Sequence, residues 1–367
     1  MKISLPYSEI EKINKLLYAK ESNMAIADLL NEFCLLRDDP LFDEINKQIK
    51  SDISLDKAML NTYLTYFGVD QTYKENKELI SKYLLNSFVE QNIDNFLNNP
   101  YNIAVKPKQF SNSKYKLVYD SYPALSLFPL DDISVDEQDN YKEITKLGFF
   151  KKEYKYLTLY KNNEIWMCIT PNEINTMSKA IDKAQGNVIT YGLGLGYFAF
   201  MVANKKTVKS VTIIDNDEEL INLFLTYLLP LFPNKDKIKI INDDAINHFK
   251  NNKVNFDYTF VDLWHNAEDG LPLYIDFLNN SNNLNIDFWI ENSLIALYRR
   301  CLLTVIEESL NGAKESIYRN AKNPIDKIIN DIYYKTKSLE IKKASDIYSL
   351  CSDTSIKSLI KCELLGN

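Results

Sequence analysis

Apolar residues recur at helical spacing through the first hundred positions. The stretches MAIADLLNEFCLLR, from residue 24, and LDKAMLNTYLTYFG, from residue 55, repeat apolar residues with the period of one helix face. Gly68 closes the second stretch and is typical of a helix end. The pattern predicts a helical N-terminal domain over residues 1–105.

The helical period fades after this point, and loop and strand signals follow. Pro107, Pro123 and Pro129 and the acidic run DDISVDEQDN predict a solvated connector. Apolar residues then alternate on both sides of the turn-forming pair Asn162-Asn163 in YKYLTLYKNNEIWMCITP, which predicts a β-hairpin. We therefore expect a connector and a small β-hairpin element over residues 106–180.

From residue 181 onward, short apolar strands alternate with helical segments. The strand-like stretches are VITY, VTIID, KIKII, FDYTFVDLW and IDFWIE. This alternation predicts a parallel sheet with right-handed crossovers. The expected fold is α/β, with a Rossmann-like core over residues 181–292 and a helical C-terminal extension over residues 293–367. No antiparallel hairpin is recognisable after IDFWIE, so the existence of further strands stays open.

Composition and charge narrow the class of protein. With 46% hydrophobic and 25% charged residues the chain is typical of a globular protein, and its net charge of −7 argues against nucleic acid or a membrane as partner.

No transmembrane run or signal peptide is recognisable, and the five cysteines are scattered, which predicts a cytoplasmic protein with reduced thiols. The two histidines have no partner at metal-ligand spacing, so no metal site is expected. A homodimer stays open.

Three of the nine glycines lie close together in the stretch NVITYGLGLGYFA, at Gly192, Gly194 and Gly196. A strand, a glycine turn and a helix bring backbone N–H groups close to a ligand. The pattern has Tyr197 where a dinucleotide fingerprint places its third glycine, and it lacks the Lys and Ser/Thr of a phosphate loop. The turn therefore predicts a nucleoside ligand that is not held through a phosphate.

Acidic residues end the strands that follow the glycine turn. Asp215 ends VTIID, Asp244 follows KIKII, and Asp262 ends the strand in FDYTFVDLW. Ligands of open α/β sheets bind outside the carboxyl ends of the strands. A carboxylate at Asp215 can accept hydrogen bonds from both ribose hydroxyls, and one at Asp244 from an adenine amino group. The series fits an adenosine with a charged, phosphate-free tail.

The same acids have a purely structural alternative. Asp215 and Asp244 each precede a predicted helix and could serve as its N-cap. Before the helix DEELINLFL, the cap could instead fall to Asn216 or Asp217, which would leave Asp215 for a ligand.

The glycine turn and the acids, in this order, resemble the class I S-adenosylmethionine (SAM)-dependent methyltransferases over about residues 187–292. The resemblance implies SAM as cofactor and an acid facing the reacting end at Asp262. The residues implied to contact SAM are Gly192, Leu193, Gly194, Gly196, Asp215, Asn216, Asp244, Ala245 and Asp262. Many of these enzymes carry an acid two residues before the first glycine, where this chain has Thr190.

Within that superfamily, the layout is most similar to the spermidine synthases. They also place a small β-domain directly before the glycine strand, and VTIIDND and INDDA resemble their second-strand and third-strand motifs. Three features depart from them. Leu195 stands where their glycine turn has Asp, DLWHNAEDG replaces a catalytic loop rich in Asp and Ser, and PNEINTM lacks their Tyr-His pair.

The stretch DLWHNAEDG would lie where the transferred group must be. Asp262 and His265 are candidates to orient or deprotonate the nucleophile, since an unperturbed histidine titrates near neutrality. Trp264 and Glu268 are candidate contacts to a cationic substrate. Glu173, in PNEINTM, is a candidate to replace the acid missing before the first glycine. The structural alternatives are a surface histidine, a packed tryptophan and a first-turn helix acid.

We therefore expect a SAM-dependent methyltransferase, with a small molecule or a protein of unknown identity as acceptor. One alternative keeps the donor but transfers its aminopropyl or aminocarboxypropyl arm, as in spermidine synthase-like proteins. The other is a non-catalytic module that binds SAM or nothing and docks a partner protein through its helical ends. The by-product distinguishes the two transfers, because methyl transfer releases S-adenosylhomocysteine and arm transfer releases methylthioadenosine.

Overall fold

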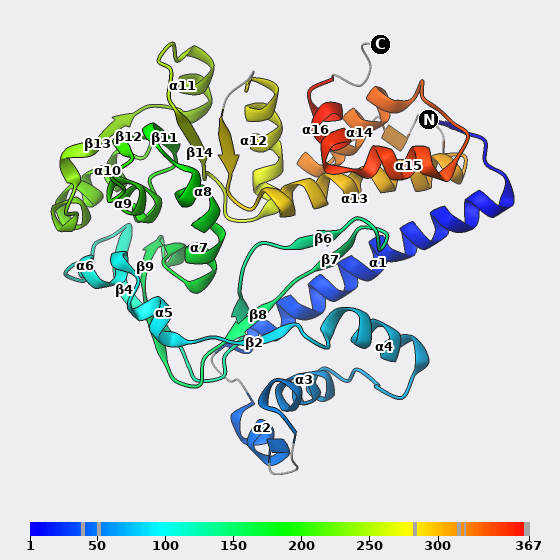
Figure 1. Ribbon diagram of the computed structural model, residues 1–367, viewed down its shortest axis with the longest axis horizontal. Coiled ribbons are helices and arrows are strands. Elements are labelled where there is room, and N and C mark those ends of the chain that lie inside the picture. The colour runs from blue at the N-terminus through cyan, green and yellow to red at the C-terminus, as the bar shows by residue number, and fades with distance from the viewer. Residues whose placement is uncertain (38–40, 50–52, 282–284, 314–316, 319–320, 363–367) are drawn as a thin grey trace.

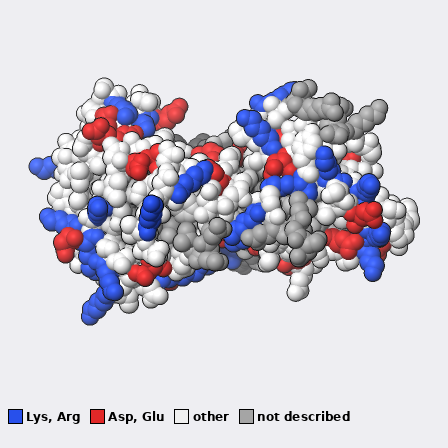
Figure 2. All heavy atoms as spheres, turned by 90° about the horizontal axis from the view of Figure 1, so that it is seen from above, with Lys and Arg blue, Asp and Glu red and all other residues white. Residues whose placement is uncertain are grey.

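The computed structural model describes residues 1–37, 41–49, 53–281, 285–313, 317–318 and 321–362. The parallel sheet and its helices form one side of the molecule, and the C-terminal helices with the long N-terminal helix Tyr7–Leu35 form the other (Figure 1). Seen from above, these two lobes are joined by a narrower middle, and on the face shown the basic side chains are interspersed with acidic ones (Figure 2). Within the described ranges, no helix is both long and apolar enough to cross a membrane.

A five-stranded parallel sheet forms the centre of the core. Its spatial order is β13-β12-β11-β14-β15, so the first strand in sequence lies in the middle. The strands are β11 (Gly186–Tyr191), β12 (Val208–Asp215), β13 (Ile238–Asn242), β14 (Tyr258–Val261) and β15 (Ile286–Phe288). The inner strands β11 and β14 are almost fully buried, as expected of strands covered on both faces. The predicted parallel sheet is confirmed.

Helices connect these strands and cover the sheet. They are α7 (Pro171–Thr176), α8 (Ser178–Lys183), α9 (Tyr197–Ala203), α10 (Glu218–Leu223), α11 (Ala245–Asn251) and α12 (Ala267–Asn279). A π-helical turn (Phe224–Leu228) and two short 3₁₀ turns (Leu229–Leu231 and Lys235–Lys237) follow α10. In the part of the chain that the structure describes, the sheet ends at β15, because the chain turns at Ile290 into a long helix.

An antiparallel sheet, ordered β10-β9-β4-β3, lies directly before the parallel core in sequence. The predicted hairpin is confirmed as β9 (Tyr154–Lys161) and β10 (Glu164–Cys168), with Asn162 and Asn163 both at positive φ in its turn. The segment expected to be a connector differs from the prediction. It contains β3 (Phe110–Ser111) and β4 (Tyr115–Tyr122), and β4 pairs with β9 along its whole length. Strand β9 lies far from β4 along the chain, and a local sequence pattern gives no signal for such a distant pairing.

Short strands in and around the same segment form two smaller sheets. One has the order β2-β8-β5 and the other pairs β6 with β7. The strands are β2 (Phe88–Glu90), β5 (Phe128–Pro129), β6 (Ser134–Asp136), β7 (Lys142–Ile144) and β8 (Leu147–Phe149). The acidic run predicted as a loop therefore also contributes one short strand, β6.

The helical ends of the chain pack on each other. The first hundred residues contain α1 (Tyr7–Leu35), α2 (Phe42–Ile49), α3 (Leu55–Tyr66), α4 (Lys74–Leu79), a π-helical turn (Ile80–Leu84), α5 (Ile93–Leu97) and α6 from Pro100 to Ala104. The C-terminal part contains α13 (Glu291–Leu310), α14 (Pro324–Thr336), α15 (Ala344–Cys351) and α16 (Asp353–Ile360). Helix α1 contacts α13 and α15, and β1 (Lys2–Ile3) pairs with β16 (Glu340–Ile341). The domain boundaries at 105, 180 and 292 stay a prediction.

The start of α13 is held by a residue from a distant loop. Ile290, which precedes the helix, has φ +47° and provides no side-chain cap. The carboxylate of Asp132 instead accepts hydrogen bonds from the backbone N–H groups of Asn292, at 3.0 Å, and Ser293, at 3.2 Å. Burial raises the pKa of Asp132, and these bonds oppose the rise. The side chain of Asp132, which is distant in sequence, thus takes the role of the N-cap of α13.

We expect Asp132→Ala to destabilise the fold by about 1–2 kcal/mol, because it removes the acceptor from two N–H groups in the first turn of α13. Denaturant unfolding followed by circular dichroism measures this. Glu137→Ala, which changes another acid on the same segment, is the control and should leave the free energy of unfolding within about 0.5 kcal/mol of wild type. Equal effects of the two substitutions would contradict the cap.

Candidate active site

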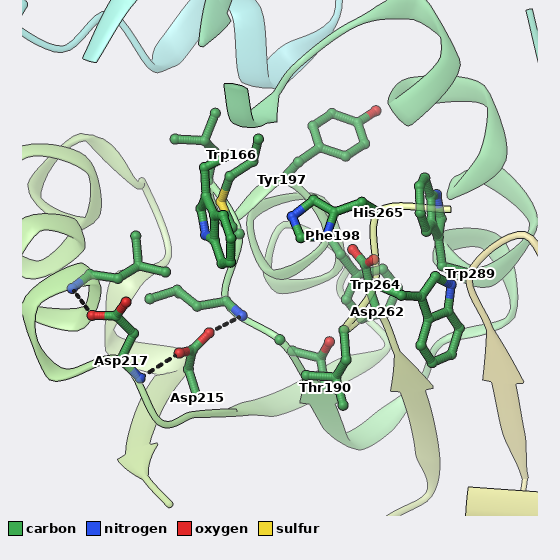
Figure 3. A pocket seen from close by; sticks show the side chains of 18 of the residues that line it. Trp166, Thr190, Tyr197, Phe198, Asp215, Asp217, Asp262, Trp264, His265 and Trp289 are labelled. Carbon is green, nitrogen blue, oxygen red and sulfur yellow. Dashed lines mark hydrogen bonds between the residues drawn. The ribbon is translucent and has the colours of Figure 1, made fainter. Parts of the chain in front are cut away.

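A cavity of about 600 Å³ lies at the carboxyl ends of the parallel strands. The glycine turn after β11 and the segments after β12, β13, β14 and β15 line it from the sheet, and the hairpin strand β10 and helix α7 line it from the other side. Figure 3 shows Asp215 and Asp217 at one side of this pocket and Asp262, Trp264 and Trp289 at the other. The position agrees with the rule for ligands of open α/β sheets.

The first two glycines of the turn after β11 have different surroundings. Gly192 has φ +103°, and a Cβ atom there would lie 1.9 Å from the carbonyl oxygen of Asp262, so only glycine lets the strands close. Gly194 has φ +56°, but nothing lies closer than 3.9 Å to its would-be Cβ. Its outer side therefore borders open cavity, where a ligand can approach the backbone. Gly196 is the N-cap residue that precedes helix α9.

Asp215 is bound to the glycine turn and remains available to a ligand. One carboxylate oxygen accepts from the backbone N–H of Leu193 at 3.0 Å, and the other from the N–H of Asp217 at 2.9 Å. Burial raises the pKa of Asp215. Each carboxylate oxygen can accept a second bond. The N-cap residue of α10 is Asp217, whose side chain accepts a hydrogen bond from the N–H of Leu220. Asp215 is therefore not the helix cap.

Asp217 also ties the antiparallel sheet to the core. Its carboxylate accepts hydrogen bonds from Lys161 Nζ at 2.8 Å and from the Tyr115 hydroxyl at 2.6 Å. Burial opposes ionisation, but these bonds outweigh it and lower the pKa of Asp217. Lys161 also lies over the ring of Trp166, with 4.1 Å between Nζ and the ring centroid. Neither Lys161 nor Trp166 was among the residues expected at the site.

The remaining residues expected at the nucleoside also line the cavity. Asn216, Asp244 and Ala245 follow the ends of β12 and β13 there. Asp244 serves as the N-cap of α11, since one of its oxygens accepts from the N–H of Asn247 at 2.8 Å. Asp244 is therefore a helix cap, as the structural alternative predicted, and it also borders the cavity. A contact between these residues and an adenosine stays a prediction.

Two carboxylates at the other end of the cavity stand near each other, and the described part of the chain places no lysine or arginine beside them. Glu173 comes from α7, and Asp262 follows β14. Among the described residues, neither side chain has a hydrogen bond or an ion pair. Burial, and then repulsion from Asp262, raises the pKa of Glu173 well above its usual range. Burial raises the pKa of Asp262 to about 7. The pair is an unsatisfied acidic site that a cationic ligand would complete.

The other residues of the DLWHNAEDG stretch lie at different depths. Trp264 is buried beside the cavity, and its indole packs over Gly270. His265 is half-exposed, and its ring Nδ1 lies 3.1 Å from an oxygen of Asp269. Its ring also contacts Trp166, with 4.8 Å between the two ring centroids. Glu268 is exposed in the first turn of α12 and does not line the cavity. The structure therefore brings Asp262, Trp264 and His265 together but leaves Glu268 outside.

All three tryptophans of the chain line this one cavity. Besides Trp264, these are Trp166 in β10 and Trp289 after β15, and neither was predicted as a site residue. Trp289 donates its indole N–H to the hydroxyl of Thr176 at 2.8 Å, which links the end of β15 to α7. The only sequence signal for them was the concentration of the rarest aromatic residue near the ends of predicted strands.

The comparison with known domain families gives one match. The sequence profile of the Spermine/spermidine synthase domain matches residues 167–274, which include the glycine turn, Glu173 and Asp262. This is less than a third of the chain. The chain matches no curated protein sequence.

Two solved structures are similar to the chain at low identity. One is the spermidine synthase from Thermotoga maritima, at 13% identity, and the other is a spermidine synthase in complex with the transition state analogue AdoDATO, at 14% identity. Each alignment has a TM-score of 0.29 and covers 40% of this chain and 58% of the other. The chain thus spans little more than half the length of these structures, and a TM-score this low adds nothing to the fold described above.

The family match corrects the main functional expectation. Methyl transfer was expected, but the matching domain is that of the spermine and spermidine synthases, so the methyltransferase prediction is wrong and the aminopropyl alternative fits better. The glycine turn and the strand-end acids did not separate the two, because both donors carry the same adenosine. The segment that supplies most of the cavity lining is therefore similar to the spermine/spermidine synthase domain.

Proposed function

We propose that this protein transfers an aminopropyl group from decarboxylated SAM to an amine. The observation that carries the proposal is the half-buried pair Glu173 and Asp262 in the cavity wall, which has no cationic partner among the described residues. Aminopropyl transfer brings two nitrogen groups into one site, the ammonium of the donor's tail and the attacking amine of the acceptor. Two carboxylates meet that requirement.

The charge of the whole cavity supports the same donor. Its lining contains five carboxylates, and Lys161 is the one lysine or arginine among the described lining residues. That ammonium already pairs with Asp217. A donor tail that carries an ammonium and no carboxylate therefore suits this cavity better than the tail of SAM itself, which adds a further carboxylate near Glu173. The charge of the cavity therefore argues against transfer of an aminocarboxypropyl group, for which SAM itself would be the donor.

The proposed roles follow the position of each residue. Asp215 accepts from the ribose hydroxyls, Asp244 from the adenine amino group, and the open side of Gly194 faces the donor. Glu173 holds the ammonium of the donor's tail. Asp262 orients the acceptor amine, and its raised pKa suits a group that takes up a proton near neutral pH.

The reaction is a single displacement. The lone pair of the acceptor nitrogen forms a bond to the methylene carbon attached to the sulfonium, and the carbon–sulfur electron pair passes to sulfur, which leaves as neutral methylthioadenosine. The nitrogen then loses one proton, which Asp262 accepts. His265, the other candidate base, is half-exposed and bonded to Asp269, and we assign it to the entrance of the cavity.

The test is turnover of the full chain with decarboxylated SAM and a mixture of primary amines. We expect methylthioadenosine in excess over protein, and no S-adenosylhomocysteine when SAM replaces the donor. Asp215→Asn should weaken donor binding about tenfold or more by calorimetry, with an unchanged circular dichroism spectrum. Donor binding without methylthioadenosine for any amine would overturn the proposal, as would S-adenosylhomocysteine formed from SAM.

A further inference from the structure

The cavity has two ends of different chemistry along the edge of the sheet. Asp215, Asp217 and Asp244 follow β12 and β13, on one side of the glycine turn. On the other side, Trp264 and Trp289 lie near Asp262 and beyond it (Figure 3). We call this part the acceptor wall and define it by Met177, Trp264, Leu273 and Trp289. Its residues come from α12 and from the segments after α7, β14 and β15.

The acceptor wall contains no spare carboxylate for a second ammonium. Under the proposed function, Glu173 is used by the donor's tail and Asp262 by the attacking amine. The nearby acids of α12 do not replace them, since Glu268 is exposed and Asp269 is bonded to His265 and to the N–H of Asn266. Neither of these acids is among the described residues that line the cavity.

The wall instead is apolar and closely packed. Trp264 and Trp289 are 5% and 6% exposed, so they form a packed, water-poor boundary, and Met177 and Leu273 complete it. An ammonium placed against such a surface loses its hydration without gaining a carboxylate, which is costly. An alkyl chain or a ring placed there gains apolar burial.

We propose that the acceptor is a monoamine with an apolar, chain- or ring-bearing body, and not a diamine. This inference rests on the proposed aminopropyl transfer and names the substrate class of that same site. The primary amine lies at Asp262, and the apolar body lies against the acceptor wall.

The first experiment compares two acceptors that differ only in a terminal ammonium, n-butylamine and 1,4-diaminobutane, with decarboxylated SAM as donor. Methylthioadenosine release gives kcat/KM for each. We expect n-butylamine to be better by about tenfold or more, because no carboxylate compensates the second ammonium. We expect 4-phenylbutylamine to exceed n-butylamine, since the ring adds apolar contact with the wall.

A substitution in the wall tests the physical reason. Leu273→Glu places a carboxylate at the acceptor wall, and Leu273→Gln places a side chain of similar size without charge. We expect the glutamate variant to shift the ratio of the two kcat/KM values toward the diamine by about tenfold or more, and the glutamine variant to leave that ratio near wild type. If the glutamate variant fails to fold, the wild-type comparison still decides.

The outcomes separate this inference from the proposed function. A preference of the wild-type protein for 1,4-diaminobutane over n-butylamine would overturn the monoamine inference and leave aminopropyl transfer standing. Absence of methylthioadenosine with every amine, despite donor binding, would overturn the proposed function and this inference with it.

Discussion

Asp262→Asn is expected to lower kcat by about 10²- to 10⁴-fold while donor binding remains. The substitution keeps the size of the side chain but removes the group that accepts the proton of the amine. Burial raises the pKa of Asp262 to about 7, so its base form becomes available as pH rises through neutrality. The wild-type kcat should therefore increase between about pH 6 and pH 8. Methylthioadenosine release across this range measures both effects.

The control for Asp262 is His265→Gln. It changes the other candidate base, which is half-exposed and bonded to Asp269, and should keep kcat within about tenfold of wild type. A large loss in the histidine variant together with a small loss in Asp262→Asn would exchange the two roles.

The raised pKa of Asp262 also predicts a dependence of stability on pH. In the folded protein Asp262 keeps its proton up to about pH 7, whereas the ordinary pKa of an aspartate side chain is 3.8. The folded state thus binds more protons than the unfolded state in this window, so the pair makes the protein less stable as pH rises from about 4 to about 7. Asp262→Asn should remove this contribution and raise the melting temperature at pH 8 while it removes activity.

Gly192→Ala is expected to have the largest effect on folding, a loss of more than about 3 kcal/mol. The new Cβ would lie 1.9 Å from the carbonyl oxygen of Asp262, which is backbone and cannot swing aside, and the residue has φ +103°. β11 and β14 would have to separate at the centre of the sheet. Denaturant unfolding and the soluble yield of the variant measure the loss.

Gly194→Ala is the matched comparison in the same turn. Its Cβ would meet nothing closer than 3.9 Å, and φ +56° is tolerated by L residues at a cost of about 1–2 kcal/mol. This variant should fold but bind the donor at least about tenfold more weakly, because the methyl group occupies the open side of the turn. Normal donor affinity in folded Gly194→Ala would show that the ligand does not approach this turn.

The parts of the site that the sequence predicted are those built from consecutive residues. β11, the glycine turn and α9 form one continuous segment, and Asp215 and Asp244 follow strands whose apolar runs are clear. Parallel strands joined by crossover connections end on the same side of the sheet, so these residues are expected at one edge. The amino-acid sequence alone is therefore enough to predict a nucleoside site at this edge.

The missed parts depend on residues that are distant in sequence. β4 was interpreted as part of a connector because its partner β9 lies beyond a loop and two small sheets. Trp166 and Lys161 reach the cavity only because the antiparallel sheet folds over the glycine turn. The meeting of Glu173 with Asp262 depends on α7 and the segment after β14 lining the same cavity. The choice between methyl and aminopropyl transfer depends on that pair, not on the adenosine motif.

The most direct test of the central claim is a single incubation that contains SAM and decarboxylated SAM at equal concentrations with n-butylamine, analysed by mass spectrometry. We expect the amine to gain an aminopropyl group and methylthioadenosine to be the only nucleoside product, because the acidic cavity favours the donor tail without a carboxylate. A methylated amine together with S-adenosylhomocysteine, or an aminocarboxypropyl product from SAM, would contradict it.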